Sequence, residues 1–488
     1  MRTRHLLRRV PARAVLAAVI AAAVLPTPAA FAGDGHADGS LDPRFGRGGI
    51  VRTAVAPDGN TDYQNGLAID DRHRILVSGS SDLGEAGGGF QWRIARYTPD
   101  GRLDSSFGSG GIVFTPMSGV GGDDEHIWRL AVQKDGKIVA AGHVATAAGG
   151  EDFAVARYLP DGRLDHTFGA QGRVVTALTP HDDEAQSLRI QDDGRIVVAG
   201  YAGTGEGTDG RDFALVRYLP DGRLDRSFDR SGPRPGTVVT DIEGGRDQLR
   251  DITLDTRGRI VAAGSATLTA ERGGTSFSVA RYLGDGSLDP AFGSGDPRPG
   301  VVVTPMAAND GLDLAESVVI DRHNRILAGG SADADGRFDL ALARYRPDGS
   351  LDRRFGDAGK VLANVGPGST DEDLAGLALQ PDGRILAGGS TAATEFAVDS
   401  DFLLARFRDD GTLDRGFGRG GFVITRTAPG EADDEIFDIA LQTPNRLVAA
   451  GECDQPATGR DVCLARYLVS PWQGRPEWRR VRVDLHRG

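Results

Sequence analysis

Acidic residues recur at one position along the chain, in a pattern that would suit a cation site. In seven places an aspartate or glutamate stands five residues before a short apolar run such as 130–133. The seven acids are Asp62, Glu125, Asp183, Asp247, Asp313, Glu372 and Asp434. Four of them lie in acidic clusters, at 123–125, 182–184, 371–373 and 433–435. Gathered around one mouth of a channel, the seven carboxylates would repel one another, and a bound cation would relieve that repulsion.

The residue types favour calcium over zinc as that cation. Carboxylate oxygens are hard ligands, and neither histidine nor cysteine recurs at this position. The acids also have a purely structural use, because a carboxylate can cap its own loop by accepting backbone N–H bonds. The extra acids of the four clusters exceed what capping requires, so both uses stay open. The sequence requires no cofactor, and Ca²⁺ is the candidate.

Catalytic motifs do not accompany these acids. The sequence has no HExxH pair and no GxSxG elbow between a strand and a helix, and its 9 histidines are scattered. Non-enzymatic binding or scaffolding is the first interpretation, with an extracellular protein, a glycan or a small ligand as partner. The alternative is an extracellular hydrolase or lyase that uses carboxylates at the same mouth. An enzyme should break the repeat symmetry, and His126 and His181, beside acids of neighbouring repeats, are the best candidates for that break.

An internal repeat in the sequence indicates which strands position these residues. The phrase LDxxF returns with gaps of 60 to 64 residues, and its phenylalanines are Phe45, Phe107, Phe168, Phe228, Phe292, Phe355 and Phe417. Each period holds three apolar runs separated by an Asp-Gly turn and a Gly-rich loop, and a Pro-Asp-Gly turn usually follows the third run. A fourth strand is expected to begin with the LDxxFG phrase itself. The sequence therefore predicts an all-β fold, a seven-bladed β-propeller of four-stranded blades.

A salt bridge is predicted inside each complete repeat. The arginine of the third run is followed eight residues later by the aspartate of the LD phrase, so a hairpin would place the two side chains on facing strands. The predicted pairs are Arg96–Asp104, Arg157–Asp165, Arg217–Asp225, Arg281–Asp289, Arg344–Asp352 and Arg406–Asp414. Repetition in identical copies favours a structural role over a ring of ligand-binding arginines.

The first and last copies of the phrase are incomplete in complementary ways. Arg466 has no aspartate eight residues on, and Asp42 has no arginine before it. These two residues are predicted to pair, so that the N-terminal strand completes the seventh blade and closes the ring. A competing interpretation is that the alternating segment 478–485 forms the fourth strand of that blade.

The ends of the chain are predicted to lie outside the propeller. Residues 1–32 have the positive start, apolar run and small-residue site of a secretory signal peptide, the propeller covers 33–468, and a tail covers 469–488. Cys453 and Cys463 are expected to form a disulfide in the oxidising compartment that export implies. The mature chain is predicted to be secreted and monomeric.

The charge of the mature chain limits its partners. Removing the five arginines of the signal takes the formal net charge from −13 to −18. Such an acidic protein is not expected to bind nucleic acid or an anionic membrane.

The repeat resembles the delta-60 repeat family, whose members carry tandem repeats of this length with an LDxxFGxxG phrase after an ARYxxDG turn. The resemblance covers about residues 41–425, and the third-strand phrase extends it to Leu468. It implies a secreted bacterial β-propeller and no shared catalytic activity. The order of the phrases is also similar to that of NHL-type propellers, which are chiefly binding platforms, although lyases occur among related rings.

Overall fold

The computed structural model describes residues 37–55, 62–84, 90–117, 125–146, 150–205, 210–242, 244–267, 274–307, 311–334, 336–366, 371–392, 400–427, 433–455 and 458–470. The chain divides into two compact units, Met1–His36 and Ala37–Gly488, and all described residues belong to the second. The predicted signal peptide and the competing strand at 478–485 lie outside the described residues. Within the described part of the chain, no helix has the length and apolarity needed to cross a membrane.

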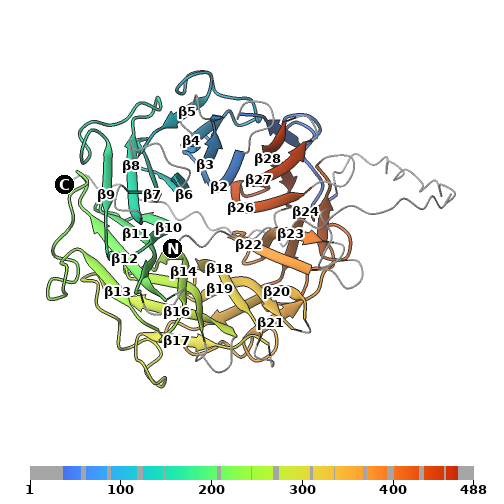
Figure 1. Cartoon of the computed structure of the whole chain (residues 1–488). Coiled ribbons are helices and arrows are strands. Elements are labelled where there is room, and N and C mark those ends of the chain that lie inside the picture. The colour runs from blue at the N-terminus through green and yellow to red at the C-terminus, as the bar shows by residue number, and fades with distance from the viewer. Residues whose placement is uncertain are drawn as a thin grey trace, which may run out of the picture. The chain divides into compact units, whose positions relative to one another are not determined.

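Seven strands surround the centre of the ring (Figure 1). These inner strands are β2 (Asp62–Ile69), β6 (Glu125–Val132), β10 (Asp183–Ile190), β14 (Asp247–Leu254), β18 (Asp313–Ile320), β22 (Asp371–Leu379) and β26 (Asp434–Thr443). Each contacts the inner strand of the neighbouring blade. They follow one another in the same direction, so their first residues gather at one mouth of the central channel.

Three further strands complete each blade, in antiparallel order from the centre outward. The second strands are β3 (Ile75–Asp82), β7 (Ile138–Ala145), β11 (Ile196–Gly203), β15 (Ile260–Thr267), β19 (Ile326–Asp333), β23 (Ile385–Ala392) and β27 (Arg446–Gln455). The third strands are β4 (Phe90–Tyr97), β8 (Glu151–Tyr158), β12 (Arg211–Tyr218), β16 (Thr275–Tyr282), β20 (Phe338–Tyr345), β24 (Ser400–Phe407) and β28 (Gly459–Leu468). The outer strands are β5 (Ile112–Thr115), β9 (Arg173–Thr176), β13 (Thr237–Thr240), β17 (Val301–Thr304), β21 (Lys360–Ala363), β25 (Phe422–Thr425) and β1 (Ile50–Thr53).

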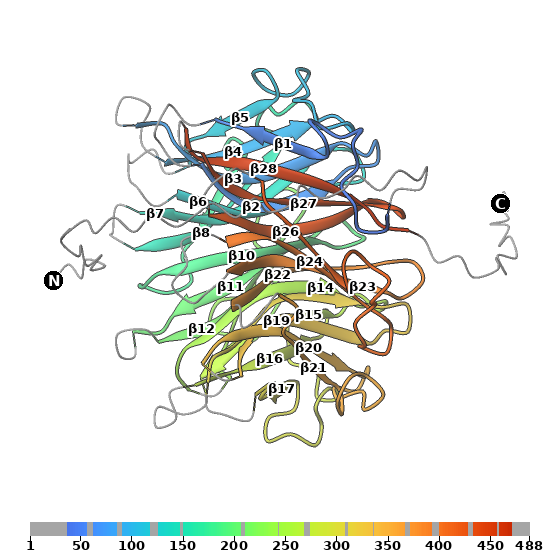
Figure 2. The ribbon, with the colours of Figure 1, turned by 90° about the vertical axis from the view of Figure 1, so that its right-hand side faces the viewer.

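The N-terminal strand closes the ring, as the sequence predicts. The seventh blade has the order β1-β28-β27-β26, with Ile50 opposite Ala465 and Thr53 opposite Val462. Figure 2 shows the blue β1 beside the red β28, the two ends of the described chain. The prediction that the fourth strand begins at the LD phrase is wrong, because the outer strands are only four residues long. The LD leucine makes a single bridge to the third strand, as Leu164 does to Tyr158, and a turn follows it.

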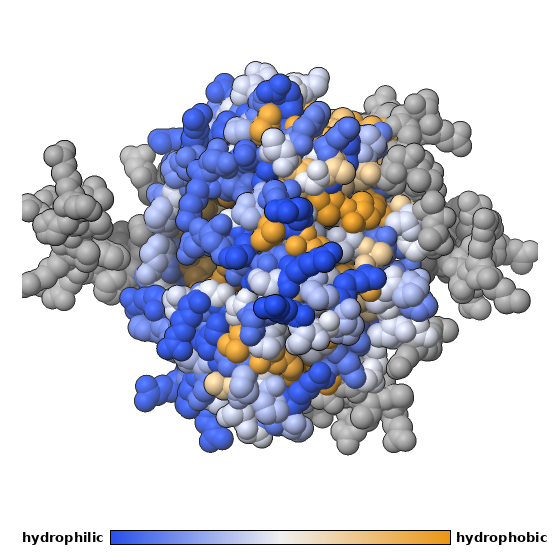
Figure 3. Space-filling model, turned by 90° about the vertical axis from the view of Figure 1, so that its left-hand side faces the viewer, coloured by the Kyte–Doolittle hydropathy of each residue, from blue (hydrophilic) through white to orange (hydrophobic). Residues whose placement is uncertain are grey.

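The hydrophobic core lies between neighbouring blades. One cluster joins Phe213 and Phe228 of the third blade to Leu249 and Ile252 of the fourth. Another joins Phe45 and Val448 of the seventh blade to Leu67 and Ile75 of the first. At the outer rim, apolar side chains are scattered among hydrophilic ones on the face that Figure 3 shows.

A bulge interrupts the pairing of every inner strand with the second strand of its blade. In β6 the bulge falls between Ile127 and Arg129, so Trp128 has no partner in the ladder. A glycine must stand opposite, because a Cβ on Gly142 would come within 1.9 Å of the carbonyl oxygen of His126. Bulges re-aim side chains. Here they leave one residue of every inner strand outside the ladder.

Candidate functional site

The arginines and aspartates of the repeat phrase form a joint between blades. In all seven pairs the closest N···O distance is 2.8 to 3.0 Å, and each guanidinium carbon lies 4.4 to 4.7 Å from the centre of the LDxxF phenyl ring. The pairs are Arg96–Asp104, Arg157–Asp165, Arg217–Asp225, Arg281–Asp289, Arg344–Asp352, Arg406–Asp414 and Arg466–Asp42. Most of these arginines also donate to a carbonyl in the turn of the next blade, as Arg96 does to Pro160 at 2.5 Å. These contacts have a structural role, because they hold neighbouring blades together. They lie on the face of the ring opposite the first residues of the inner strands.

The seven recurrent acids lie within the inner strands, and the expectation that they precede these strands is corrected. Six are the first residue of their strand and Glu372 is the second. The strands begin earlier than the apolar runs because their first halves alternate between buried and partly exposed residues and include polar side chains, which an apolar pattern does not mark. All seven side chains are buried, at 0 to 4 % exposure.

These buried acids bond to the loop that connects two blades. Their carboxylates accept backbone N–H bonds from residues just after the preceding outer strand, as Asp62 does from Val55 at 2.8 Å and Asp434 from Thr427 at 2.8 Å. The corresponding bonds of the other acids are Met117 to Glu125, Leu178 to Asp183, Ile242 to Asp247, Met306 to Asp313 and Gly366 to Glu372. The geometry is that of loop caps rather than of an open carboxylate ring at the mouth.

The repeats differ from one another at the residue that follows each capping acid. We call this set the mouth ring: Tyr63, His126, Glu184, Gln248, Leu314, Asp373 and Glu435. The bulged residues form a second set, the bulge ring: Asn65, Trp128, Gln186, Arg250, Glu316, Ala375 and Phe437. Bulge-ring members contact each other between blades, since Arg250 Nη1 donates to Gln186 Oε1 at 3.3 Å and Arg250 Nε lies 3.6 Å from Glu316 Oε1. In both rings, equivalent positions of the seven repeats carry side chains of different chemical types.

Aromatic and imidazole side chains gather on blades one and two. We call Tyr63, Phe90, His126, Trp128 and His143 the mouth cluster. Tyr63 stacks on Phe90 with ring centres 5.4 Å apart, and His126 tilts against both rings at 5.7 and 5.8 Å. His143 continues the row, 5.3 Å from His126. All but His143 keep part of their surface exposed, so the cluster offers an aromatic shelf to a ligand.

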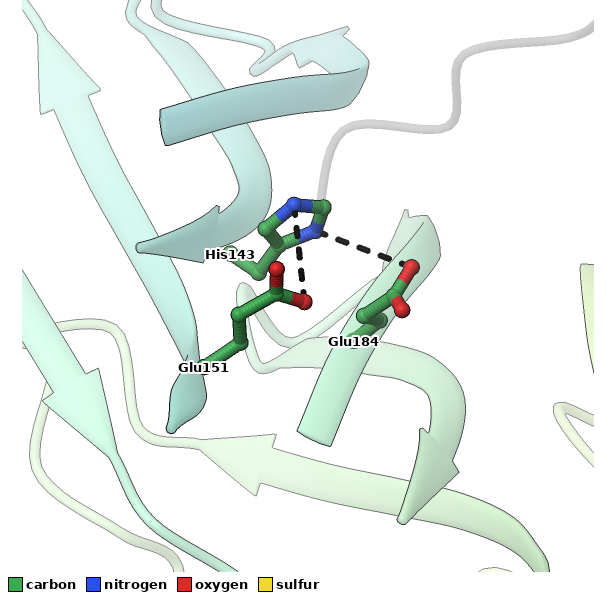
Figure 4. A group of neighbouring side chains, drawn as sticks. All are labelled: His143, Glu151 and Glu184. Atoms are coloured by element: carbon green, nitrogen blue, oxygen red, sulfur yellow. Dashed lines mark ion pairs between the residues drawn. The ribbon is translucent and has the colours of Figure 1, made fainter. Parts of the chain in front are cut away.

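His143 stands between two carboxylates at the end of this row (Figure 4). Its Nε2 lies 3.8 Å from Glu151 Oε2, and its Nδ1 lies 4.0 Å from Glu184 Oε2. Trp128 Nε1 donates to Nδ1 at 3.2 Å. Burial, followed by the positive influence of His126 and Arg211, lowers the pKa of His143 to about 3. The imidazole is therefore neutral at physiological pH.

Polar contacts extend this site into blade three. Arg211 Nη2 lies 3.6 Å from Glu184 Oε1, and its guanidinium covers the Tyr201 ring at 4.3 Å. Burial and the neighbouring Glu184 carboxylate raise the pKa of Tyr201, so its phenol stays protonated. Gln186 Nε2 donates to Glu184 Oε2 at 3.4 Å. Glu184 is thus held from several sides at the edge of the shelf.

The opposite part of the mouth is acidic. A cavity of about 350 Å³ over blades five to seven is lined by residues that include Leu314, Asp371, Asp373, Ser390, Asp433 and Glu435. Burial, with repulsion from Asp433, raises the pKa of Glu435. Glu452 lies opposite Glu435 in the ladder, and burial raises its pKa to about 7.

Sequence reasoning identified only part of this site. His126 belongs to the mouth cluster, whereas His181 is exposed on the loop before β10, beside Gly205. His143, Glu151 and Trp128 were missed because they lie on different strands at unrelated spacings. Aligning the repeats residue by residue would have marked His126 and Trp128 as departures from the other blades. Cys453 and Cys463 form the expected disulfide, which links β27 to β28.

Comparison with known proteins supports the propeller architecture. Six segments, 74–107, 133–168, 191–228, 258–292, 324–355 and 380–417, match a domain of unknown function (DUF5122) described as a beta-propeller. No curated protein matches the sequence.

Several solved structures are similar to the chain. A protein of unknown function from Dyadobacter fermentans DSM 18053 is 13% identical over 86% of this chain and 100% of its own, with a TM-score of 0.42. A catalytically inactive H270A virginiamycin B lyase from Staphylococcus aureus is 8% identical over 86% and 99%, with a TM-score of 0.43. A polysaccharide lyase PL25, an ulvan lyase, is 11% identical over 86% and 96%, with a TM-score of 0.46. None of these similarities bears on the chemistry of the mouth.

Proposed function

We propose that this seven-bladed β-propeller, built from repeats of which six match DUF5122, is an exported binding protein whose ligand docks at the channel mouth. The observation that carries the proposal is the concentration of differences between otherwise similar repeats in the mouth ring. A scaffold alone needs no such differences. Concave sites that join aromatic surface to a few placed polar groups are typical of ligand binding.

The proposed ligand is a polyhydroxylated ring compound, such as a saccharide. The Tyr63–Phe90 stack, with the tilted ring of His126 beside it, gives an aromatic surface against which the C–H face of a sugar can pack. Glu151 and Glu184 border that surface with carboxylate oxygens that accept bonds from hydroxyl groups. The acidic charge of the mature chain disfavours polyanionic ligands.

A glycan array followed by calorimetry on the best saccharide tests this proposal. Tyr63→Ala removes one ring of the stack and should weaken binding at least tenfold, which corresponds to about 1.4 kcal/mol. The matched control is Phe114→Ala, an exposed aromatic residue of the outer strand β5, which should bind as the wild type does. Absence of binding to every glycan, or equal loss in both variants, would refute the proposal.

A second candidate function is hydrolysis or elimination at the acidic cavity. It is favoured by the raised pKa of Glu435, because burial that favours the protonated form of a carboxyl group suits it to act as a general acid. Incubation with a polysaccharide panel, read by new reducing ends or by absorbance of unsaturated products, tests it. Glu435→Gln should abolish any turnover, and turnover that survives this change would rule out the role of Glu435.

A further inference from the structure

We infer that His143, Glu184 and Glu151 form a site for a divalent transition metal such as Zn²⁺. His143 Nδ1 and Glu184 would be the ligands, and Glu151 would lie behind the imidazole. One ligand atom from each of the three residues lies within 4.8 Å of the others. The inference goes beyond the proposed saccharide binding and does not depend on it.

The protonation of His143 assigns these roles. The indole N–H of Trp128 can only donate, so the Nδ1 that accepts from it at 3.2 Å carries the lone pair. The proton is then on Nε2, which faces Glu151 Oε2 at 3.8 Å. A carboxylate behind the protonated nitrogen of a metal-bound histidine orients the ring and increases its basicity. The Nδ1 lone pair faces Glu184, whose Oε2 is 4.0 Å away.

The local charge also favours a cation. Two carboxylates lie beside the buried imidazole, and Arg211 Nη2 lies 3.6 Å from Glu184. A nitrogen ligand beside a carboxylate suits Zn²⁺ better than Ca²⁺, which prefers a shell of oxygens. Two protein ligands leave the remaining positions to water.

Binding requires a small and observable rearrangement. With metal–ligand distances near 2.0 to 2.1 Å, tetrahedral ligands stand about 3.3 Å apart, so Glu184 must approach Nδ1. The Trp128 N–H must give up its acceptor when the metal takes the Nδ1 lone pair. Trp128 fluorescence should therefore change on binding.

The test is Zn²⁺ titration of the untagged mature chain, read by calorimetry, by metal content after dialysis, and by fluorescence. We expect one Zn²⁺ for each chain. His143→Gln and Glu184→Gln should weaken binding at least a hundredfold, and Glu151→Gln by 10- to 100-fold. Trp128→Phe should keep the metal and lose the fluorescence change.

The matched control is Asp241→Asn. Asp241 lies with Asp212 and Asp247 in a second group of close ligand atoms that contains only oxygens, and its loss should leave Zn²⁺ affinity unchanged. Retention of Zn²⁺ by both His143→Gln and Glu184→Gln, or no binding by the wild type, would overturn the inference. Thermal melting shows whether each variant is folded, and the Glu184 and Trp128 variants remain informative if the His143 variant is not. Because zinc is the only probe, a failure here is distinct from a failure to bind saccharides.

Discussion

At the scale of residues, two ion pairs of one turn differ only in their surroundings. Arg157–Asp165 and Arg163–Asp161 have N···O distances of 2.9 and 2.8 Å. The first pair is buried, with side chains 6 % and 4 % exposed, and the second is open to solvent at 77 % and 46 %. Distance alone therefore says little about what each pair contributes to stability.

Arg157→Met should lower the free energy of unfolding by about 3 kcal/mol, because the buried Asp165 carboxylate loses its guanidinium partner and keeps only Lys137 Nζ, 3.4 Å away. Arg163→Met should change it little, since water and salt already screen that pair. Urea denaturation of both variants measures the difference. Equal effects would show that the joint between blades does not depend on the buried charge.

A second residue-scale prediction concerns Glu452, whose carboxylate accepts the Gln64 N–H at 2.7 Å and lies 3.2 Å from Arg460. Burial outweighs these contacts and raises its folded-state pKa to about 7, above the ordinary glutamate pKa of 4.5. The folded state therefore binds the proton more tightly than the unfolded state. Its contribution to stability is full below pH 4.5 and is lost as pH rises through 7.

Comparison with Glu452→Gln isolates this effect. Between pH 8 and pH 5 the wild type should gain about 2.5 kcal/mol relative to the variant, a figure that follows from the pKa difference. Denaturant titrations at several pH values measure it. Parallel stability curves for the two proteins would contradict the prediction.

The residues of the candidate site were less predictable than those of the joint. The joint repeats in every blade at constant spacing, so periodicity alone locates it. The mouth cluster exists because residues of β2, β4, β6 and β7 come together, and no sequence spacing encodes that arrangement. The recurrent acids were found but placed outside the strands, because the residues after them, such as those of 63–65, alternate between buried and partly exposed positions without an apolar pattern.

At the scale of elements, the seventh blade depends on β1. Deleting residues 33–53 should expose the edge of β28 and leave Arg466, which is 3.0 Å from Asp42, without its partner. We expect a loss of about 3–5 kcal/mol from the buried charge alone. Calorimetric melting of this deletion and of a variant that lacks residues 476–488 provides the comparison. A large effect of the second deletion and none of the first would show that the tail supplies the fourth strand.

The strand count and the closure could be predicted because turn sequences repeat with the period of the blade. The length of the outer strands could not, since LDHTFG alternates like a strand but is used to contact the next blade. The backbone of Gly169 donates to Asp221 in the following turn at 2.8 Å. That hydrogen bond joins two blades, so the local sequence of neither blade indicates it.

At the scale of the whole molecule, the seam between the chain ends is built like an ordinary turn. Gly39 N donates to Leu468 O at 2.7 Å and Leu468 N to Ser40 O at 2.8 Å, the same bonds that close the turn from Leu159 to Arg163. Joining Leu468 directly to Ala37 would produce Leu-Ala-Asp-Gly, with the spacing of 159–162.

A circular permutant that carries this junction and begins at Pro160 should fold and melt close to the wild-type temperature. Opening the chain inside β14, between Arg250 and Asp251, should instead prevent folding, because it cuts a strand that contacts both neighbouring blades. Circular dichroism and size-exclusion chromatography distinguish the outcomes. Failure of the first permutant would mean that the seam stores strain that the native ends relieve.

The two faces of the ring also differ in how freely they can change over generations. The joint at one face is the same in every blade, whereas the mouth ring at the other differs from blade to blade. Duplication or exchange of a whole repeat by recombination would therefore preserve the joint between blades and bring a new side chain to the mouth. The residues that hold the blades together can therefore stay constant while the residues that determine ligand specificity change. A library of shuffled repeats could sample new ligands without redesign of any interface between blades.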